Sequence, residues 1–189
     1  MSQVVATSFT EASADDWDHL VAAGDHAYVA EAGQSHLQML AAQEHNAPRG
    51  WQLNNYQHSL QCATRALRAG EPDEFIITAL FHDIAQDFYP YSHDQMSANL
   101  LAPYLSDENL WVIANHQVFQ LSFRTHSRFN RRAHEAHREN PYYAKALYFC
   151  EHYDQNCFDP RYAAEPLATF APMVEAHFSA KMRAALKTY

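Results

Sequence analysis

Hydrophobic residues recur along most of this chain at intervals of three and four, which predicts helices. The clearest run lies between residues 53 and 69, where the apolar positions are four, three and four residues apart: Tyr56, Leu60, Ala63 and Leu67. This spacing is typical of one buried helical face. Gly70 follows the run and is expected to end that helix. The next run, residues 75–80, is apolar on nearly every side, which predicts a helix at the centre of the fold.

Similar patterns predict six further helices, separated by Gly, Pro or polar breaks. They are expected at about residues 13–23 with Gly24 as the end, from Ser35 to the break at 47–50, from 93, from 106, from 140, and from about 166 to 187. Residues 121–140 hold five arginines and are predicted to be irregular. The sequence therefore predicts an all-α fold, with an arm of short helices over residues 1–50 that can act as a lid, and a helical bundle over 51–189.

Composition narrows the function classes. The 189 residues suit one ordinary domain. A net charge of −9 argues against a nucleic-acid binder, although a local cluster of Arg or metal ions can still hold an anionic substrate. The three cysteines show no pairing pattern, so a reducing cytoplasm is the expected location. No signal peptide or membrane-spanning stretch is recognised.

A His-Asp pair stands at the end of the most apolar stretch of the chain, in the tetrapeptide Phe81-His82-Asp83-Ile84. A buried imidazole and carboxylate need a strong partner, because burying either charge alone costs several kcal/mol. A metal ion is the expected partner, since imidazole supplies a nitrogen ligand and a carboxylate can bridge two ions. A hydrogen-bonded His-Asp pair at a helix end is the alternative.

Four more residues have the right chemistry to join that pair, and each lies near the end or on the inner face of a predicted helix. The complete candidate set is His58, His82, Asp83, His93, His116 and Asp154. Helical bundles commonly build metal sites from such positions. His and carboxylate ligands alone do not choose between Fe, Mn, Co, Ni and Zn.

The order H…HD…D resembles the HD-domain superfamily, and the two intervening histidines resemble its two-metal subset. Residues 57–63 and 79–84 are similar to the mixed-valent diiron oxygenases that cleave organophosphonates, and the resemblance covers about residues 50–157. It implies a single HD domain over residues 51–189 with two iron ions. One iron would be held by His58, His82, Asp83 and Asp154. The second would be held by Asp83 as the bridge, with His93 and His116, which leaves positions for substrate and dioxygen.

This chain departs from the family pattern just ahead of the first histidine. A Tyr and a Glu that form a lid pair in one relative fall, by counting back from His58, at Pro48 and Trp51. Replacing a carboxylate by an aromatic ring suits a quaternary ammonium, which binds aromatic faces by cation–π attraction. We therefore expect Trp51 to contact the substrate; a core or hinge aromatic is the alternative.

Two further departures concern the phosphonate. The family has a His three residues after the Asp and a Lys four residues after the fourth His, where this chain has Gln86 and Gln120. Both glutamines are expected at the substrate. The anion would then need other cations, for which Arg128 and Arg131 are the candidates; a solvated basic face around these residues and Arg124 is the alternative.

The resemblance implies an oxygenase that uses dioxygen to break the C–P bond of a 1-hydroxyphosphonate. The expected substrate is (R)-1-hydroxy-2-(trimethylammonio)ethylphosphonate, giving glycine betaine and phosphate. Three alternatives stay open: the same reaction on 2-amino-1-hydroxyethylphosphonate giving glycine, a metal-dependent HD phosphohydrolase that activates water, and a metal-dependent binding module. No nucleic-acid or membrane partner is expected.

Overall fold

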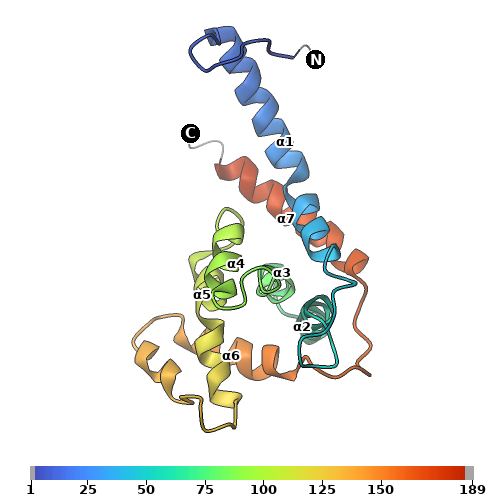
Figure 1. Cartoon of the computed structure of the whole chain (residues 1–189), viewed down its shortest axis with the longest axis vertical. Helices are drawn as coiled ribbons and strands as arrows, with labels where there is room; N and C mark the ends of the chain where they lie inside the picture. Colours follow the sequence, from blue (N-terminus) through green and yellow to red (C-terminus); the bar gives the residue numbers. More distant parts are fainter. Residues whose placement is uncertain (1–2, 186–189) are drawn as a thin grey trace.

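The computed structural model describes residues 3–185, in which helices are the regular secondary structure and no strand occurs. Seven α-helices and three short 3-10 helices follow in this order (Figure 1): α1 (Ala14–Ala41), α2 (Asn55–Ala69), α3 (Asp73–Phe81), α4 (His93–Leu101), α5 (Asp107–Gln120), η1 (Leu121–Phe123), η2 (Ala133–His137), α6 (Tyr143–His152), η3 (Asp154–Asn156) and α7 (Leu167–Ala185). The predicted all-α class is confirmed. Lys187, the predicted end of the last helix, lies outside the described residues.

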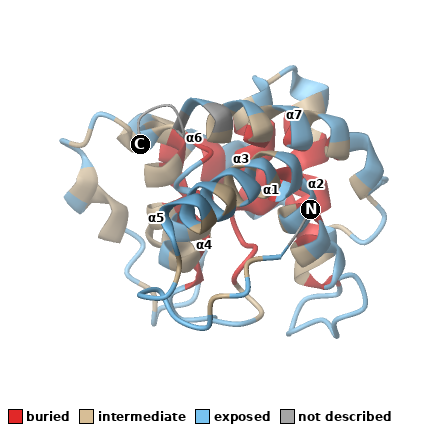
Figure 2. Ribbon diagram, turned by 90° about the horizontal axis from the view of Figure 1, so that it is seen from above, coloured by how far each residue is buried: buried red, intermediate tan, exposed pale blue. Residues whose placement is uncertain are grey.

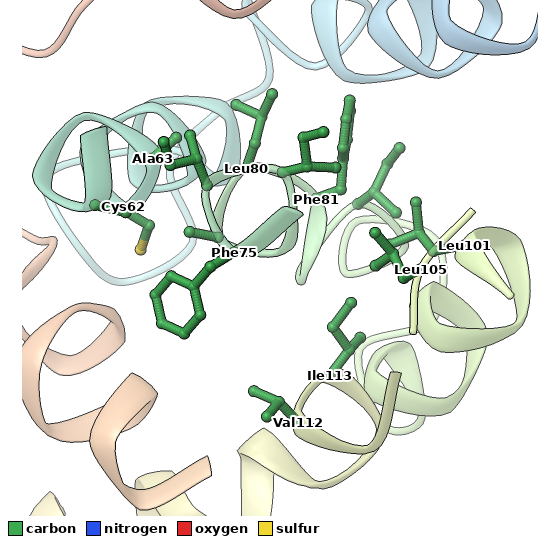
Figure 3. Close-up of a cluster of buried hydrophobic side chains, with 14 of the residues drawn as sticks. Cys62, Ala63, Phe75, Leu80, Phe81, Leu101, Leu105, Val112 and Ile113 are labelled. Carbon is green, nitrogen blue, oxygen red and sulfur yellow. The ribbon is translucent and has the colours of Figure 1, made fainter. Parts of the chain in front are cut away.

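Helix α3 lies at the centre of the fold, as its apolar sequence predicts. Every residue from Phe75 to Phe81 is buried. Side chains from α2, α4 and α5 belong to the same core (Figure 3), among them Cys62, Leu101 and Ile113. The buried residues gather between the helices, and the exposed ones cover the outside (Figure 2). Because burying one large apolar side chain stabilises the fold by about 1.5–3 kcal/mol, this core holds the end of α3 firmly in place.

Helix α2 begins and ends where its sequence predicts. The Asn54 side chain accepts a hydrogen bond from the backbone N–H of Gln57, and the Gln57 side chain accepts one from the backbone N–H of Asn54, so the two form a capping box. At the other end Gly70 has a φ of 77°, a left-handed conformation that favours glycine. These two caps fix where α2 begins and ends, and therefore which of its residues face the core.

The first two predicted helices form one continuous helix, so that prediction is wrong. Helix α1 runs through both Gly24 and Gly33 without a break. Each glycine costs only about 1 kcal/mol in a helix interior, which tertiary packing can offset. Helix α1 packs along α7 (Figure 1), and a Cβ atom on Gly33 would lie 2.6 Å from the Cα atom of Glu175. Gly33 therefore allows two helices to approach closely and does not end one.

The segment between α5 and α6 is irregular, as predicted. Residues 121–140 contain only η1 and η2. Helix α5 starts after Ser106, as its sequence indicates, whereas α3 begins at Asp73 with Pro72 before it and no side-chain cap. None of the described helices is both long enough and apolar enough to cross a membrane.

Candidate metal centre

Six polar side chains from distant parts of the chain meet at one buried point. They are His58 on α2, His82 and Asp83 at the end of α3, His93 at the start of α4, His116 on α5 and Asp154 at the start of η3. No more than 5% of any of them is exposed. The structure thus brings together all six candidate ligands. Asp154 differs from its prediction in one respect, because it lies just after α6 and not on that helix.

The His-Asp pair owes its position to the turn that follows α3. His82 is the residue that caps α3, and two amide side chains hold the backbone directly after it. Asn55 donates a hydrogen bond to the backbone carbonyl of Asp83 at 2.8 Å, and Gln43 donates one to that of Ile84 at 2.8 Å. These contacts fix the turn, so the Asp83 carboxylate projects into the interior.

One oxygen of Asp83 faces a first set of donors. Its Oδ2 atom lies 3.8 Å from His58 Nε2 and 3.6 Å from His82 Nε2. Asp154 Oδ1 completes this set, at 3.3 Å from His58 Nε2 and 3.8 Å from His82 Nε2. Two ligands about 2.1 Å from one ion and at right angles to each other are about 3 Å apart. The spacing of the first set is therefore close to that of atoms around a single metal ion.

The other oxygen of Asp83 faces a second set. Its Oδ1 atom lies 3.0 Å from His93 Nε2 and 3.0 Å from His116 Nε2, and those two nitrogens are 3.2 Å apart. The two oxygens of one carboxylate are thus divided between two groups of nitrogen atoms. A carboxylate in this position can bridge two cations and partly neutralise both.

The ring nitrogens that point away from the centre all contact backbone carbonyls. The Nδ1 atoms of the four histidines lie 2.6–3.2 Å from carbonyl oxygens, in the pairs His58–Cys157, His82–Ala79, His93–Pro90 and His116–Ile113. A carbonyl only accepts, so Nδ1 carries the proton and Nε2 of a neutral ring keeps its lone pair. For His93 the amide nitrogen of Gln117 also lies 3.0 Å from Nδ1, and because that nitrogen is itself a donor, only the Pro90 carbonyl can accept the Nδ1 proton. Outer partners of this kind are characteristic of histidines that ligate metals.

The contacts between the inward nitrogens call for a positive charge. His58 Nε2 and His82 Nε2 are only 3.3 Å apart, and two lone pairs facing each other at that distance repel. Asp154 Oδ1 is buried and accepts no well-aligned hydrogen bond. Unpaired buried oxygens are rare because they cost about 1–3 kcal/mol or more. A metal ion between these atoms would satisfy all of them.

The pKa values point the same way. Burial disfavours a charged imidazole, but the Asp83 and Asp154 carboxylates favour it more strongly, so the pKa of His82 rises to about 9. Burial also opposes ionisation of the two carboxyl groups, yet the adjacent histidines outweigh it and hold the pKa of Asp83 and that of Asp154 well below the usual range. Both carboxylates are therefore ionised in the interior, where they attract cations.

A pocket of about 400 Å³ opens onto the centre and is lined by residues that include His58, Asp83, His93 and Trp51. Trp51 lies where the sequence predicts a substrate contact. Its ring stacks on Phe158 at 4.2 Å, and Phe158 stacks on the ring of His58 at 4.6 Å. Trp51 remains 62% exposed, so much of its surface stays available at the mouth of the pocket.

The two glutamines expected at the substrate hold ligand carboxylates. Gln120 donates to Asp154 Oδ2 at 2.7 Å, and Gln86, with its amide nitrogen turned toward the carboxylate, donates to Asp83 Oδ2 at 2.8 Å. Both also line the pocket. Their amides therefore orient the ligand carboxylates from the side that a substrate would enter.

The two arginines predicted to hold the phosphonate lie elsewhere. Arg131 donates to the backbone carbonyl of Ser122, and Arg128 packs over the ring of Phe129, so neither lines the pocket. The cations that do line it are Arg49 and Arg124. The irregular backbone after α5 turns Arg128 and Arg131 outward. Because this segment is not a regular helix, the direction of their side chains cannot be predicted from their spacing in the sequence.

Several residues at the site carry no recognisable signal in the sequence. Phe158 forms the aromatic wall beside His58, and the side chains of Gln43 and Asn55 hold the turn that carries Asp83. Cys62 Sγ lies 3.7 Å from His58 Nε2, one helical turn along α2. A single amide or aromatic residue in a polar stretch gives no indication of a partner tens of residues away.

Comparison with known proteins adds no family assignment. No protein-family model matches this chain. No characterised protein matches it either. The geometry of the buried His, Asp and Cys clusters is nevertheless suitable for holding a metal ion.

Proposed function

We propose that this protein is a diiron oxygenase that cleaves the C–P bond of a 1-hydroxyphosphonate. The observation that carries the proposal is the divided carboxylate of Asp83, with one oxygen toward His58 and His82 and the other toward His93 and His116. The donor set, four imidazoles and two carboxylates, suits iron in both oxidation states. Together with the motif resemblance, this arrangement supports a dinuclear site of the HD type in the cytoplasm, where the three buried thiols would stay reduced.

The proposed reaction balances without an external reductant. The substrate R–CH(OH)–PO₃H₂ and one O₂ give R–COOH and H₃PO₄. The C–P, C1–H and O–O bonds break, a new oxygen is bonded to C1 and another to phosphorus, and both atoms of dioxygen end in the products. When bound, the two irons would supply the redox chemistry that lets dioxygen react with the C1–H bond.

The protein's part is to bind and orient the substrate. Arg124 gives the pocket a positive charge for the phosphonate, and Arg49, whose Nε atom lies 3.9 Å from Asp87 in the same pocket, is a second cation for it. Gln86 and Gln120 hold the two ligand carboxylates, so the directions in which Asp83 and Asp154 point are set before the substrate enters. The Phe158 ring stacked on His58 covers that histidine and restricts water on its side.

The pocket supports a quaternary ammonium as the other end of the substrate. The exposed Trp51 ring stands at the pocket mouth, and a cation over an aromatic face gains about 0.5–2 kcal/mol. We therefore propose (R)-1-hydroxy-2-(trimethylammonio)ethylphosphonate as the substrate and glycine betaine as the organic product. The primary-amine analogue, with glycine as product, is the alternative.

The decisive experiment measures phosphate release by anaerobically purified, iron-loaded protein. Each of the two phosphonates is supplied with and without dioxygen, and the consumed O₂ is measured alongside the phosphate. The expected result is oxygen-dependent release at one phosphate per O₂, faster with the trimethylammonium compound. A preference for the primary amine would keep the reaction and reject the Trp51 argument.

A panel of phosphate esters tests the alternative reaction. If phosphate is released with metal but without dioxygen, the oxygenase assignment is wrong and a phosphohydrolase is supported. Such an enzyme would use the same ligands to activate water. If tightly bound metal is present but neither reaction occurs, the chain is better described as a metal-dependent binding module.

A further inference from the structure

A second pocket lies on the surface formed by α2, the end of α6 and the segment that leads to α7. It has a volume of about 480 Å³ and is lined by Arg65, Arg68, Ala69, Tyr148, His152, Tyr153 and Tyr162. None of these residues lines the pocket at the metal centre. In Figure 1 the end of α6 and the chain that follows it pass close to α2, and Gln61 on α2 donates to the backbone carbonyl of Asp159 at 2.8 Å.

Two guanidinium groups converge on one aromatic ring in this pocket. Arg65 lies 4.1 Å and Arg68 lies 5.3 Å from the centre of the Tyr162 ring. Two like charges repel, so their approach to a single ring costs free energy unless an anion lies near both. Arg68 has such a partner, because it forms a 2.7 Å ion pair with Glu165.

Arg65 is the cation without a partner. Its guanidinium makes no hydrogen bond and no ion pair with any residue in the range 3–185, and its Nε atom is buried. A guanidinium offers five N–H donors in a rigid fork; in Arg65 the Nε donor is buried without a partner, and the terminal nitrogens are open to the pocket. The fork matches the oxygens of a phosphate group.

The carboxylates around this pocket are already engaged by other groups. Asp159 pairs with Arg161 at 3.3 Å, and Glu71 accepts hydrogen bonds of 2.6 Å from both Tyr148 and Tyr153. Glu71 lines a neighbouring pocket and not this one. The pKa of the Asp159 carboxyl group is lowered mainly by its hydrogen bonds from Arg161 and also by the charge of Arg65, so Asp159 lies near Arg65 but does not pair with it directly.

We propose that this pocket binds a small phosphate-bearing anion, with Arg65 as the main ligand and the tyrosine rings as walls. The ligand is either inorganic phosphate or a phosphate monoester of a flat ring, because both present the same tetrahedral anion. Volumes of about 300–1,000 Å³ are typical of small-molecule sites, so the pocket has room for a ring beside the phosphate. This site is independent of the reaction proposed for the metal centre.

The test is calorimetric titration of the iron-loaded protein with inorganic phosphate and, separately, with adenosine monophosphate. The expected result is saturable binding that weakens at least about tenfold in Arg65→Gln and less in Arg65→Lys, since one charge-assisted contact contributes about 1.5–3 kcal/mol. Tighter binding of the nucleotide would identify a monoester as the ligand, and equal binding would identify phosphate itself. Circular dichroism shows whether each variant is folded.

Two arginine variants with the same change of charge serve as controls. Arg132→Gln removes an exposed cation paired with Glu135, and Arg131→Gln removes one that donates to the backbone carbonyl of Ser122, so neither variant alters a residue of either pocket. Both are expected to bind the probes as the unaltered protein does. Loss of binding in Arg124→Gln, a variant of the metal-centre pocket, but not in Arg65→Gln would place the anion at the metal centre and overturn the proposal, as would no binding of either probe up to about 10 mM.

Discussion

The two halves of the metal centre share Asp83 but differ in how completely they surround an ion. The half around His82 and Asp154 brings four side chains together, and those two residues are fully buried. The half around His93 and His116 brings three, and His93 lies in the wall of the pocket. In metalloproteins, closed sites are structural and open ones bind substrate. Both halves reach the pocket, the first through His58 and the second through His93, so the difference lies in the number of side chains: an ion in the second half would have one protein ligand fewer.

The largest effect is expected from removing the residue that the two halves share. Asp83→Ala deletes one oxygen from each set, so we predict that the protein loses dinuclear binding, falling from about two irons per chain to less than one. Iron content by elemental analysis after desalting measures this. Asp107→Ala, which removes an exposed acid in the first turn of α5, is the matched control and should keep both irons. Two tightly bound irons in Asp83→Ala would contradict the bridging assignment.

A smaller effect is expected from removing a ligand of one half only. His93→Ala should leave roughly one iron per chain, held by the four side chains of the first half, because two ligands rarely retain a metal ion. His82→Ala should weaken the first half instead and leave an ion with a different spectrum. Mössbauer spectroscopy of the two variants distinguishes the two irons. Identical spectra from both variants would show that the halves are not separate sites.

The amides behind the ligands should have a further, graded effect. Gln120→Leu removes the 2.7 Å hydrogen bond to Asp154, and loss of such an outer partner typically lowers metal affinity about 10–100-fold. Competition with a chelator measures the affinity. Gln155→Leu, on the turn that follows Asp154, is the control because the Gln155 side chain points to Glu151 and Asn156. An unchanged affinity in Gln120→Leu would mean that Asp154 is held without it.

The smallest effect is expected from Trp51, which touches neither half directly. Trp51→Ala should keep both irons and raise KM for the trimethylammonium substrate about 3–30-fold, as expected for the loss of one cation–π contact. Tyr91→Ala, which removes another exposed aromatic residue of the pocket, is the control. Equal changes in KM for the trimethylammonium and primary-amine substrates would show that Trp51 does not select the charge type.

The fold was predictable wherever local chemistry sets a boundary. The capping residues of α2 and the apolar run of α3 predict their helices because capping and burial depend on neighbours in the sequence. The break predicted between the first two helices is wrong for the opposite reason, because Gly33 lies within that stretch and serves a distant contact. The role of Gly33 depends on Glu175, which is 142 positions away in the numbering, and no pattern along the chain reveals that contact.

The six candidate ligands could be predicted from the sequence, whereas the contacts of the residues around them could not. Histidine and aspartate at helix ends also serve as ordinary caps, so the six positions could be selected from the sequence only through their joint order and the motif resemblance. The arginines gave no such guidance, since the direction of Arg128 or Arg131 depends on an irregular backbone between η1 and η2. Gln120 lines the pocket and also donates to Asp154, a contact that the sequence did not predict, because an amide suits a substrate and a carboxylate equally well.

The carbonyl groups behind the four histidines have a consequence for how such a protein can evolve. Every amino acid carries a backbone carbonyl, so replacing the side chains of Ala79, Pro90, Ile113 or Cys157 leaves an acceptor for each imidazole as long as the backbone keeps its course. The orientation of these four imidazoles is therefore uncoupled from most side-chain change around them. New specificities can arise by altering the walls of the pocket while the centre itself persists.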